Sequence, residues 1–102
     1  MPVDTTRYAR MEIVARGSAN AQISWCLLDD KGVEFAALHW KATPPADATF
    51  RTDLAPGHTV ACVQLYTWTN DGKRAENLFR TMRFVAADGT VLEVLLAEGK
   101  GR

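Results

Sequence analysis

The chain of 102 residues is 47% hydrophobic and 24% charged, which are ordinary values for one globular domain. They exclude an intrinsically disordered chain, because disorder needs low hydrophobicity or a high net charge. Twelve basic residues balance twelve acidic ones, so the formal net charge is zero. Proteins dedicated to nucleic acid usually carry a basic excess, and we therefore expect no nucleic-acid partner.

Neither a secretory signal nor a membrane span is expected. Residues 1–7 lack the apolar stretch of a signal peptide. The longest apolar run, Val91 to Ala97, contains Glu93 and is far shorter than the ~20 residues that a membrane helix needs. The expected compartment is the cytoplasm of the producing cell, or the virion if the chain is a phage component.

Alternating apolar and polar residues predict seven short strands. In chain order they are Met11–Ala15, Ala21–Leu28, Val33–Lys41, Ala48–Leu54, His58–Thr69, Arg80–Ala86 and Val91–Ala97. Turn residues at Asp29–Gly32, Asn70–Lys73 and Asp88–Thr90 predict hairpins. The pattern predicts a single all-β domain over residues 1–102, built as an antiparallel β-sandwich of about seven strands, with an open barrel as the alternative. The tail 98–102 is expected to be mobile.

The segment after Lys73 carries two conflicting patterns. Ala75, Leu78, Phe79 and Met82 follow the spacing of an amphipathic helix. Residues 80–86 alternate instead, as a strand does. The prediction is one short helical turn near 73–79, followed by a strand.

Three motifs between Ala21 and Lys73 are informative together. They are Ile23-Ser24-Trp25, Leu54-Ala55-Pro56-Gly57 and Asn70-Asp71-Gly72. This stretch resembles the fibronectin type III or immunoglobulin-like family, in which similar motifs end the second strand, form a corner between two sheets and close the strand that follows. The resemblance implies an immunoglobulin-like sandwich whose strand after the corner points Val60 and Cys62 inward. It implies no particular function, because that fold hosts many unrelated ones.

The two cysteines are expected to be free thiols. Trp25 shares its face with other apolar residues and is assigned to the core, which turns Cys26 outward. Cys62 points inward if the resemblance holds, so the two side chains would face opposite ways and could not form a disulfide. A cytosolic setting also disfavours one.

Apolar residues occupy both faces of two predicted strands. In the long strand, Val63 and Leu65 lie opposite Val60 and Cys62, and the last strand places Leu92, Val94 and Leu96 opposite Val91 and Leu95. The outer face of an open antiparallel sandwich is usually polar, so something is expected to cover these residues. The cover is either the local segment 75–82 or another subunit.

Aromatic residues supply a second signal. Trp40 and Phe35 lie on opposite faces of the same predicted strand, and Tyr66 and Trp68 share the face of Val60. Tyr66 and Trp68 either cap the core or form an exposed platform that could stack on sugars or anchor a protein partner.

No motif of catalysis or of metal or cofactor binding is found. Ser18 and Ser24 are the only serines, and neither lies in a Gly-x-Ser-x-Gly sequence. Either cysteine could in principle pair with His39 or His58, but the sequence context supports no such pair. The histidines and cysteines lack metal-ligand spacing, and there is no phosphate-binding loop. The prediction is therefore no enzyme, no metal site and no cofactor.

The expected function is a non-enzymatic structural or protein-interaction module that self-associates or docks in a larger assembly, such as a phage virion. The alternatives are a carbohydrate or small-ligand binding module that uses exposed aromatics, and a small protein inhibitor of a cellular enzyme. The expected partner is a protein, and no contact with a membrane is expected. The expected binding or interface residues are Trp40, Val63, Leu65, Tyr66, Trp68, Leu92, Val94 and Leu96.

Overall fold

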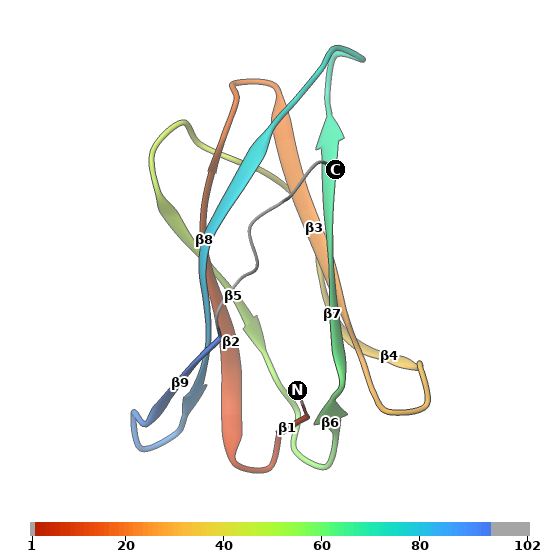
Figure 1. Ribbon diagram of the computed structural model, residues 1–102, viewed down its shortest axis with the longest axis vertical. Helices are drawn as coiled ribbons and strands as arrows, with labels where there is room; N and C mark the ends of the chain where they lie inside the picture. The colour runs from red at the N-terminus through yellow and green to blue at the C-terminus, as the bar shows by residue number, and fades with distance from the viewer. Residues whose placement is uncertain (1, 95–102) are drawn as a thin grey trace.

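The computed structural model describes residues 2–94, which form nine strands and no helix (Figure 1). The strands are β1 (Val3–Asp4), β2 (Tyr8–Gly17), β3 (Ala21–Leu28), β4 (Glu34–Ala42), β5 (Ala48–Asp53), β6 (Thr59–Val60), β7 (Cys62–Thr69), β8 (Asn77–Ala86) and β9 (Val91–Val94). All of their pairings are antiparallel. The all-β prediction is confirmed. The strand count exceeds the predicted seven because β1 was not predicted and because the predicted strand His58–Thr69 is divided into β6 and β7. The two-residue strands β1 and β6 pair with each other.

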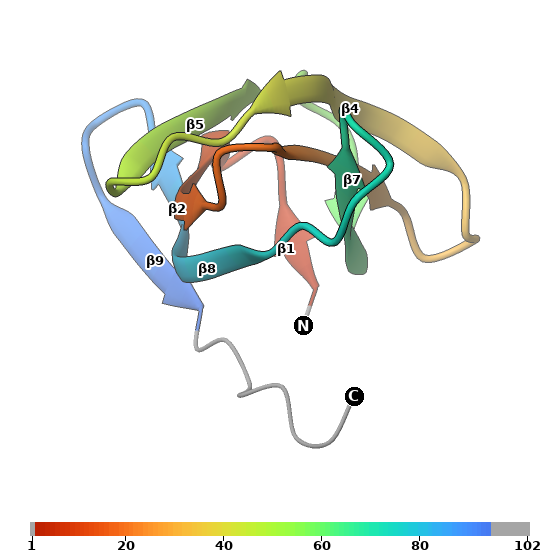
Figure 2. The same cartoon turned by 90° about the horizontal axis from the view of Figure 1, so that it is seen from above.

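Two larger sheets enclose the core. One has the strand order β5-β2-β8-β9 and the other the order β4-β3-β7. Figure 2 shows them facing each other, with β4 beside β5 along one side. The core is built from alternate residues of both sheets, as expected for packed antiparallel sheets. Its fully buried large side chains include Met11, Ile13, Ile23, Trp25, Leu27, Val60 and Phe84.

Trp25 joins the two sheets at the centre of the core. Its side chain is 1% exposed, and its indole N–H donates to the Thr52 hydroxyl of the opposite sheet at 2.8 Å. The Phe50 ring meets it edge-on, with ring centroids 6.1 Å apart. A buried indole N–H needs such a partner, because leaving it unpaired costs free energy. The core assignment of Trp25 is confirmed.

The predicted corner between two sheets is also confirmed. Leu54-Ala55-Pro56-Gly57 carries the chain from β5 in the four-stranded sheet toward β7 in the three-stranded one. Leu54 is buried and anchors the corner to the core. Gly57 has a φ of +96°, a conformation that residues with a Cβ rarely adopt.

The predicted hairpin at Asn70–Lys73 is wrong. The chain does turn there, with Gly72 at a φ of +74°, but β8 then crosses to the other sheet and pairs with β2. The amide of Asn20 holds the crossing by donating to the Asp71 carboxylate and the Arg74 carbonyl, both at 3.0 Å. These long-range contacts decide the topology, and a local turn signal carries no information about them.

The predicted helical turn near 73–79 is wrong as well. Ser18 binds both backbone groups of Glu76: its N–H donates to the Glu76 carbonyl at 2.9 Å, and its hydroxyl accepts from the Glu76 N–H at 3.0 Å. From Asn77 onward, β8 pairs with β2 as far as Ala86, with two register shifts along the ladder. The ladder of sheet hydrogen bonds outweighs the helical spacing of the apolar residues, because that spacing is only a weak preference.

A one-residue break at Ala61 reverses the predicted faces of the long strand. Val60 is fully buried, as expected, but the Ala61 N–H donates to the Leu28 carbonyl at 2.9 Å and lies in neither β6 nor β7. After the break the alternation restarts with the opposite phase. Val63 and Leu65 pack against the core, and Cys62 is exposed. The assignment of Cys62 to the interior, and of Val63 and Leu65 to the outside, is therefore wrong.

The predicted strand Val91–Ala97 is described as β9 up to Val94. Residues 95–97, with Leu96, and the tail 98–102 predicted to be mobile lie outside the described residues. Among residues 2–94, no helical segment has the length and apolar character that crossing a bilayer requires.

Candidate functional site

The structure separates the predicted interface residues into three places. Trp40, Tyr66 and Trp68 lie on the outer face of the three-stranded sheet and are 47%, 44% and 57% exposed. Val63 and Leu65 lie on the inner face of β7, half-buried against the core. Leu92 and Val94 lie on β9 in the other sheet; Leu92 is 38% exposed, and Val94 packs against the core. The first group forms a coherent surface.

That surface, here called the aromatic face, is assembled by a bulge in β4. Ile23 pairs with Lys41 and Trp25 with Leu38, so two residues of β4 lie opposite the single residue Ser24. Trp40 is one of these two residues. On the other side of β3, Trp68 pairs with Gln22. The two tryptophan rings meet with centroids 6.0 Å apart and planes tilted by 42°.

A polar cluster lies beside the two rings. The Tyr66 hydroxyl donates to Gln64 Oε1 at 2.7 Å, and the Cys26 thiol donates to the same oxygen at 3.4 Å. The Cys26 thiol is also 4.0 Å from the Tyr66 hydroxyl, and this contact together with partial desolvation raises the pKa of Tyr66 above its ordinary value. A phenol is already protonated at neutral pH, so Tyr66 acts there as a hydrogen-bond donor to Gln64.

Both cysteines are free thiols, as predicted, but for a different reason. Cys26 pairs with Gln64 and Leu28 with Cys62, so the two cysteines are diagonal neighbours on the same outer face. Such neighbours are about 7–8 Å apart, which exceeds the usual Cα separation of a disulfide.

His58 and the turn residue Asp29 have structural partners. The His58 ring stacks on Phe35 with centroids 4.5 Å apart. Asp29 accepts backbone N–H bonds from Lys31 and Val33, both at 2.9 Å, and the bond from Val33 is the main cause of its lowered pKa. Within residues 2–94, no three His, Cys, Asp or Glu side chains gather as metal ligands would.

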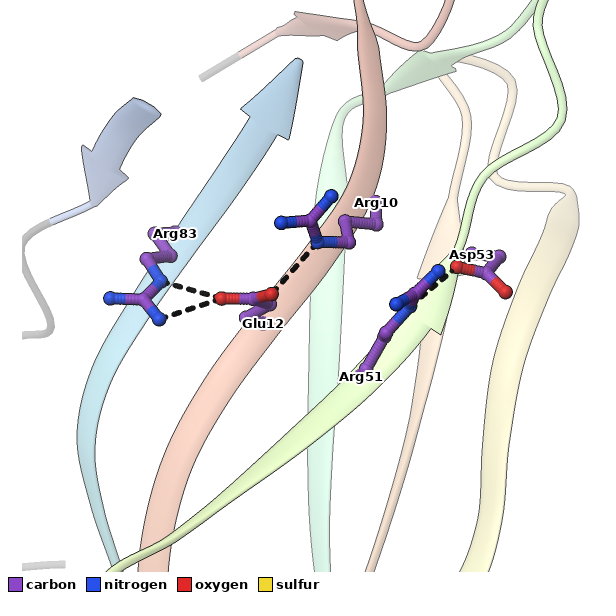
Figure 3. Close-up of polar contacts among 5 residues, drawn as sticks. All are labelled: Arg10, Glu12, Arg51, Asp53 and Arg83. Carbon is purple, nitrogen blue, oxygen red and sulfur yellow. Dashed lines mark hydrogen bonds and ion pairs between the residues drawn. The ribbon is translucent and has the colours of Figure 1, made fainter. Parts of the chain in front are cut away.

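The outer face of the four-stranded sheet carries charge instead. Glu12 on β2 accepts hydrogen bonds from Arg10 at 2.8 Å and from Arg83 on β8 at 2.7 Å, and neighbouring Arg51 pairs with Asp53 at 2.8 Å (Figure 3). The two arginines lower the pKa of Glu12, with Arg10 as the larger cause. Sequence reasoning missed this network. Alternation along β2 could have put Arg10 and Glu12 on one face, but Arg83 is 71 residues away from Glu12.

An open depression of about 920 Å³ lies where β2 ends and β8 begins, lined by Gly17, Ser18, Thr67, Glu76 and Asn77 among others. Nearby, Thr43 Oγ1 and Asn77 Oδ1 are buried without a hydrogen-bond partner among the described residues. A Cβ on Gly17 would collide with the Asn77 side chain and the Glu76 carbonyl, so only glycine fits where the strands cross. These residues pack the end of β2 against the start of β8.

The aromatic face thus combines adjacent exposed rings with a fixed hydrogen-bonding cluster, which suits recognition of another molecule. Comparison of the chain with protein families, with curated proteins and with solved structures finds no match.

Proposed function

We propose that the protein is a non-enzymatic interaction module that binds a protein partner through its aromatic face. The observation that carries this proposal is the adjacent pair of exposed tryptophans, Trp40 and Trp68, with centroids 6.0 Å apart. Large exposed rings bury much apolar area at little cost in side-chain entropy, and they dominate the binding energy of protein interfaces.

The surroundings of the rings support a protein partner. The residues of β7 that share this face, Cys62, Gln64, Tyr66 and Trp68, carry no formal charge at neutral pH. Interface centres are depleted of charged residues and enriched in tyrosine and tryptophan, with polar groups at the rim. Tyr66 and Gln64 supply such groups. The module would work in a larger assembly, and the buried Trp25 and the inter-sheet corner at Leu54–Gly57 are compatible with an immunoglobulin-like variant as its scaffold.

A carbohydrate ligand is the second candidate. Exposed tryptophans can stack on sugar rings, and the Tyr66 hydroxyl with the Gln64 amide could bind sugar hydroxyls beside them. The tilt of 42° between Trp40 and Trp68 argues against one flat sugar-binding platform, and for this reason the protein partner ranks first.

The test uses immobilised wild-type protein and the variants Trp40→Ala and Trp68→Ala to capture partners from the producing cell. Val33→Ala is the matched control, because Val33 is as exposed as Trp68 but lies in the loop before β4. We expect the control and the wild type to retain the same protein and both tryptophan variants to lose it. Titration with an oligosaccharide panel, followed by tryptophan fluorescence, tests the second candidate. Equal capture by all four proteins would refute the proposed face.

A further inference from the structure

β7 is an edge strand without the usual protection. It pairs with β3 on one side, and the described residues contain no strand on its other side (Figure 1). It is eight residues long and pairs with β3 without a register shift. Its sequence, Cys62 to Thr69, contains no charged residue, proline or glycine. An edge with these properties is a template for pairing with another strand.

The other edges of the two larger sheets are guarded. β4 carries Glu34 and Lys41 and has two register shifts against β3. β5 carries Arg51 and Asp53. β9 has four described residues and carries Glu93. Charges and irregular pairing are among the devices by which natural proteins block edge pairing, and β7 shows neither.

The pairing of β7 with β3 determines which backbone N–H and C=O groups of β7 point toward the open edge. The Asn70 N–H donates to the Asn20 carbonyl, so Asn70 and Asn20 form a hydrogen-bonded pair. Hydrogen-bonded pairs alternate along an antiparallel ladder, so the even-numbered residues of β7 bond to β3. The N–H and C=O groups of Val63, Leu65 and Thr67 therefore point toward the open edge.

We propose that two copies of this chain pair antiparallel through β7, with a two-fold axis at Leu65. This inference names one partner of the interaction module proposed above and rests on that proposal. In this register Val63 of one copy bonds to Thr67 of the other, and Leu65 bonds to its own counterpart. The two three-stranded sheets become one six-stranded sheet, and their aromatic faces become continuous.

A second copy fits this edge better than a charged strand for two reasons. A strand without charges meets no like-charge repulsion when it pairs with itself, whereas directly opposed like charges destabilise a sheet. The register also sets large side chains opposite smaller ones on the outer face. Tyr66 lies across from Gln64 of the second copy, and Trp68 lies across from Cys62. An isologous contact of this kind closes after two chains.

A proline at position 67 tests the edge. Thr67 is exposed, and its N–H is not needed for the pairing of β7 with β3, so Thr67→Pro removes two hydrogen bonds of the proposed dimer, one from each copy, but none of the β3–β7 ladder. Within the chain it also removes the hydroxyl that accepts from the Asn77 amide at 3.2 Å. The matched control is Thr49→Pro. Thr49 is an exposed threonine on the edge strand β5, and its N–H points away from β2 by the same alternation, because the Leu54 N–H donates to the Ala9 carbonyl.

Light scattering across a concentration series measures the outcome. The wild type and Thr49→Pro are expected to rise to twice the chain mass of 11.3 kDa and to stop there, and Thr67→Pro is expected to stay at the chain mass with an unchanged circular dichroism spectrum. A wild type that remains monomeric, growth beyond two chains, or equal association of the two proline variants would overturn the proposal.

A covalent test checks the register without depending on the proline. In Trp68→Cys, the new thiol lies opposite native Cys62 of the second copy in a non-hydrogen-bonded pair, where Cα atoms are about 4.5 Å apart and a disulfide is possible. Under mild oxidation, with a disulfide reagent as the oxidant, we expect a dimer linked by disulfides between the introduced thiol of one copy and Cys62 of the other, and reduction should reverse it. Trp40→Cys, away from the edge, is the control and should give little of this dimer. Equal cross-linking of both variants contradicts the register.

The two proposals fail separately. If Trp40→Ala loses the captured protein but still forms the dimer, both hold. If the wild type stays monomeric while Trp40→Ala loses the captured protein, only edge pairing is wrong. If the dimer forms but capture is unaffected by Trp40→Ala, only the aromatic face is wrong.

Discussion

The outer faces of the two larger sheets carry different kinds of side chain. On the four-stranded sheet, charged side chains neutralise one another: Glu12 lies between Arg10 and Arg83, and Arg51 pairs with Asp53 (Figure 3). On the three-stranded sheet, Trp40 and Trp68 stand exposed beside the uncharged Tyr66 and Gln64. Both faces belong to half-open antiparallel sheets, which need only one buried side.

The difference teaches where to look for binding. The charged residues at the centre of the four-stranded sheet already have partners within the chain, so a ligand there must replace existing ion pairs. The rings of the three-stranded sheet have large areas still in contact with water, and covering them releases that water. Single exposed apolar residues are normal, but adjacent large ones mark interaction surfaces.

Trp25 and Trp68 give the sharpest contrast, because they lie on neighbouring strands and point to opposite faces. We expect Trp25→Ala to lower the free energy of unfolding by about 3–5 kcal/mol, since it leaves a large cavity in the core and deprives the Thr52 hydroxyl of its hydrogen-bond partner. Trp68→Ala, at 57% exposure, should cost less than about 1 kcal/mol. Urea denaturation measures both. Similar losses for the two variants would contradict the separation of an inner and an outer tryptophan.

Glu12 is expected to be the most important side chain of the charged face. Its side chain is only 14% exposed, and Glu12→Gln leaves Arg10 and Arg83 facing each other without a carboxylate between them. The expected loss is about 1–3 kcal/mol. Asp53→Asn is the control, since its pair with Arg51 is largely exposed and should contribute about 0–1 kcal/mol. Equal effects would mean that the network stabilises nothing beyond an ordinary surface pair.

The charged face should also respond to acid. Its two arginines hold the pKa of Glu12 below the ordinary 4.5, so the unfolded chain takes up this proton more readily than the folded one. The stabilisation is present above that value and is lost as the pH falls through the lowered pKa of the folded state. Unfolding free energies measured from neutral pH downward should converge for wild type and Glu12→Gln in acid. Asp29, Asp71 and Asp88 also have lowered pKa values. Their contributions to the pH dependence of the unfolding free energy are the same in both proteins and cancel in the difference.

The smallest expected effect is on thiol chemistry at the aromatic face. Cys62 is exposed, whereas Cys26 lies buried beneath Gln64 and Tyr66. A disulfide reagent should therefore label the native protein in a fast and a slow phase, assigned by Cys62→Ser. Tyr66→Ala should speed the slow phase, because it uncovers Cys26, while Val33→Ala should leave it unchanged. A slow phase that persists in Tyr66→Ala would mean that another group shields the thiol.

Local pattern in the sequence determined the all-β class, most strand positions, the inward face of Trp25 and the turn at Pro56-Gly57, which the family resemblance made a corner between two sheets. These features depend on alternation and on turn residues, which act over a few positions. The exposure of Tyr66 and Trp68 was left open between two interpretations, because the alternation was carried through Ala61 without a break. The single extra residue there moved every following side chain to the other face, as a one-residue slip does.

Tertiary structure alone decided which strands and side chains that are distant in the sequence come into contact. The path of β8 to β2 in place of a hairpin depends on Asn20 and Ser18, which bind backbone groups more than 50 residues away. The meeting of Trp40 with Trp68 needs a bulge in β4 and the pairing of two strands on β3. The contact of Glu12 with Arg83 needs the register of β2 and β8. Such contacts arise from strand order and register, and these are set by the packing of the whole chain.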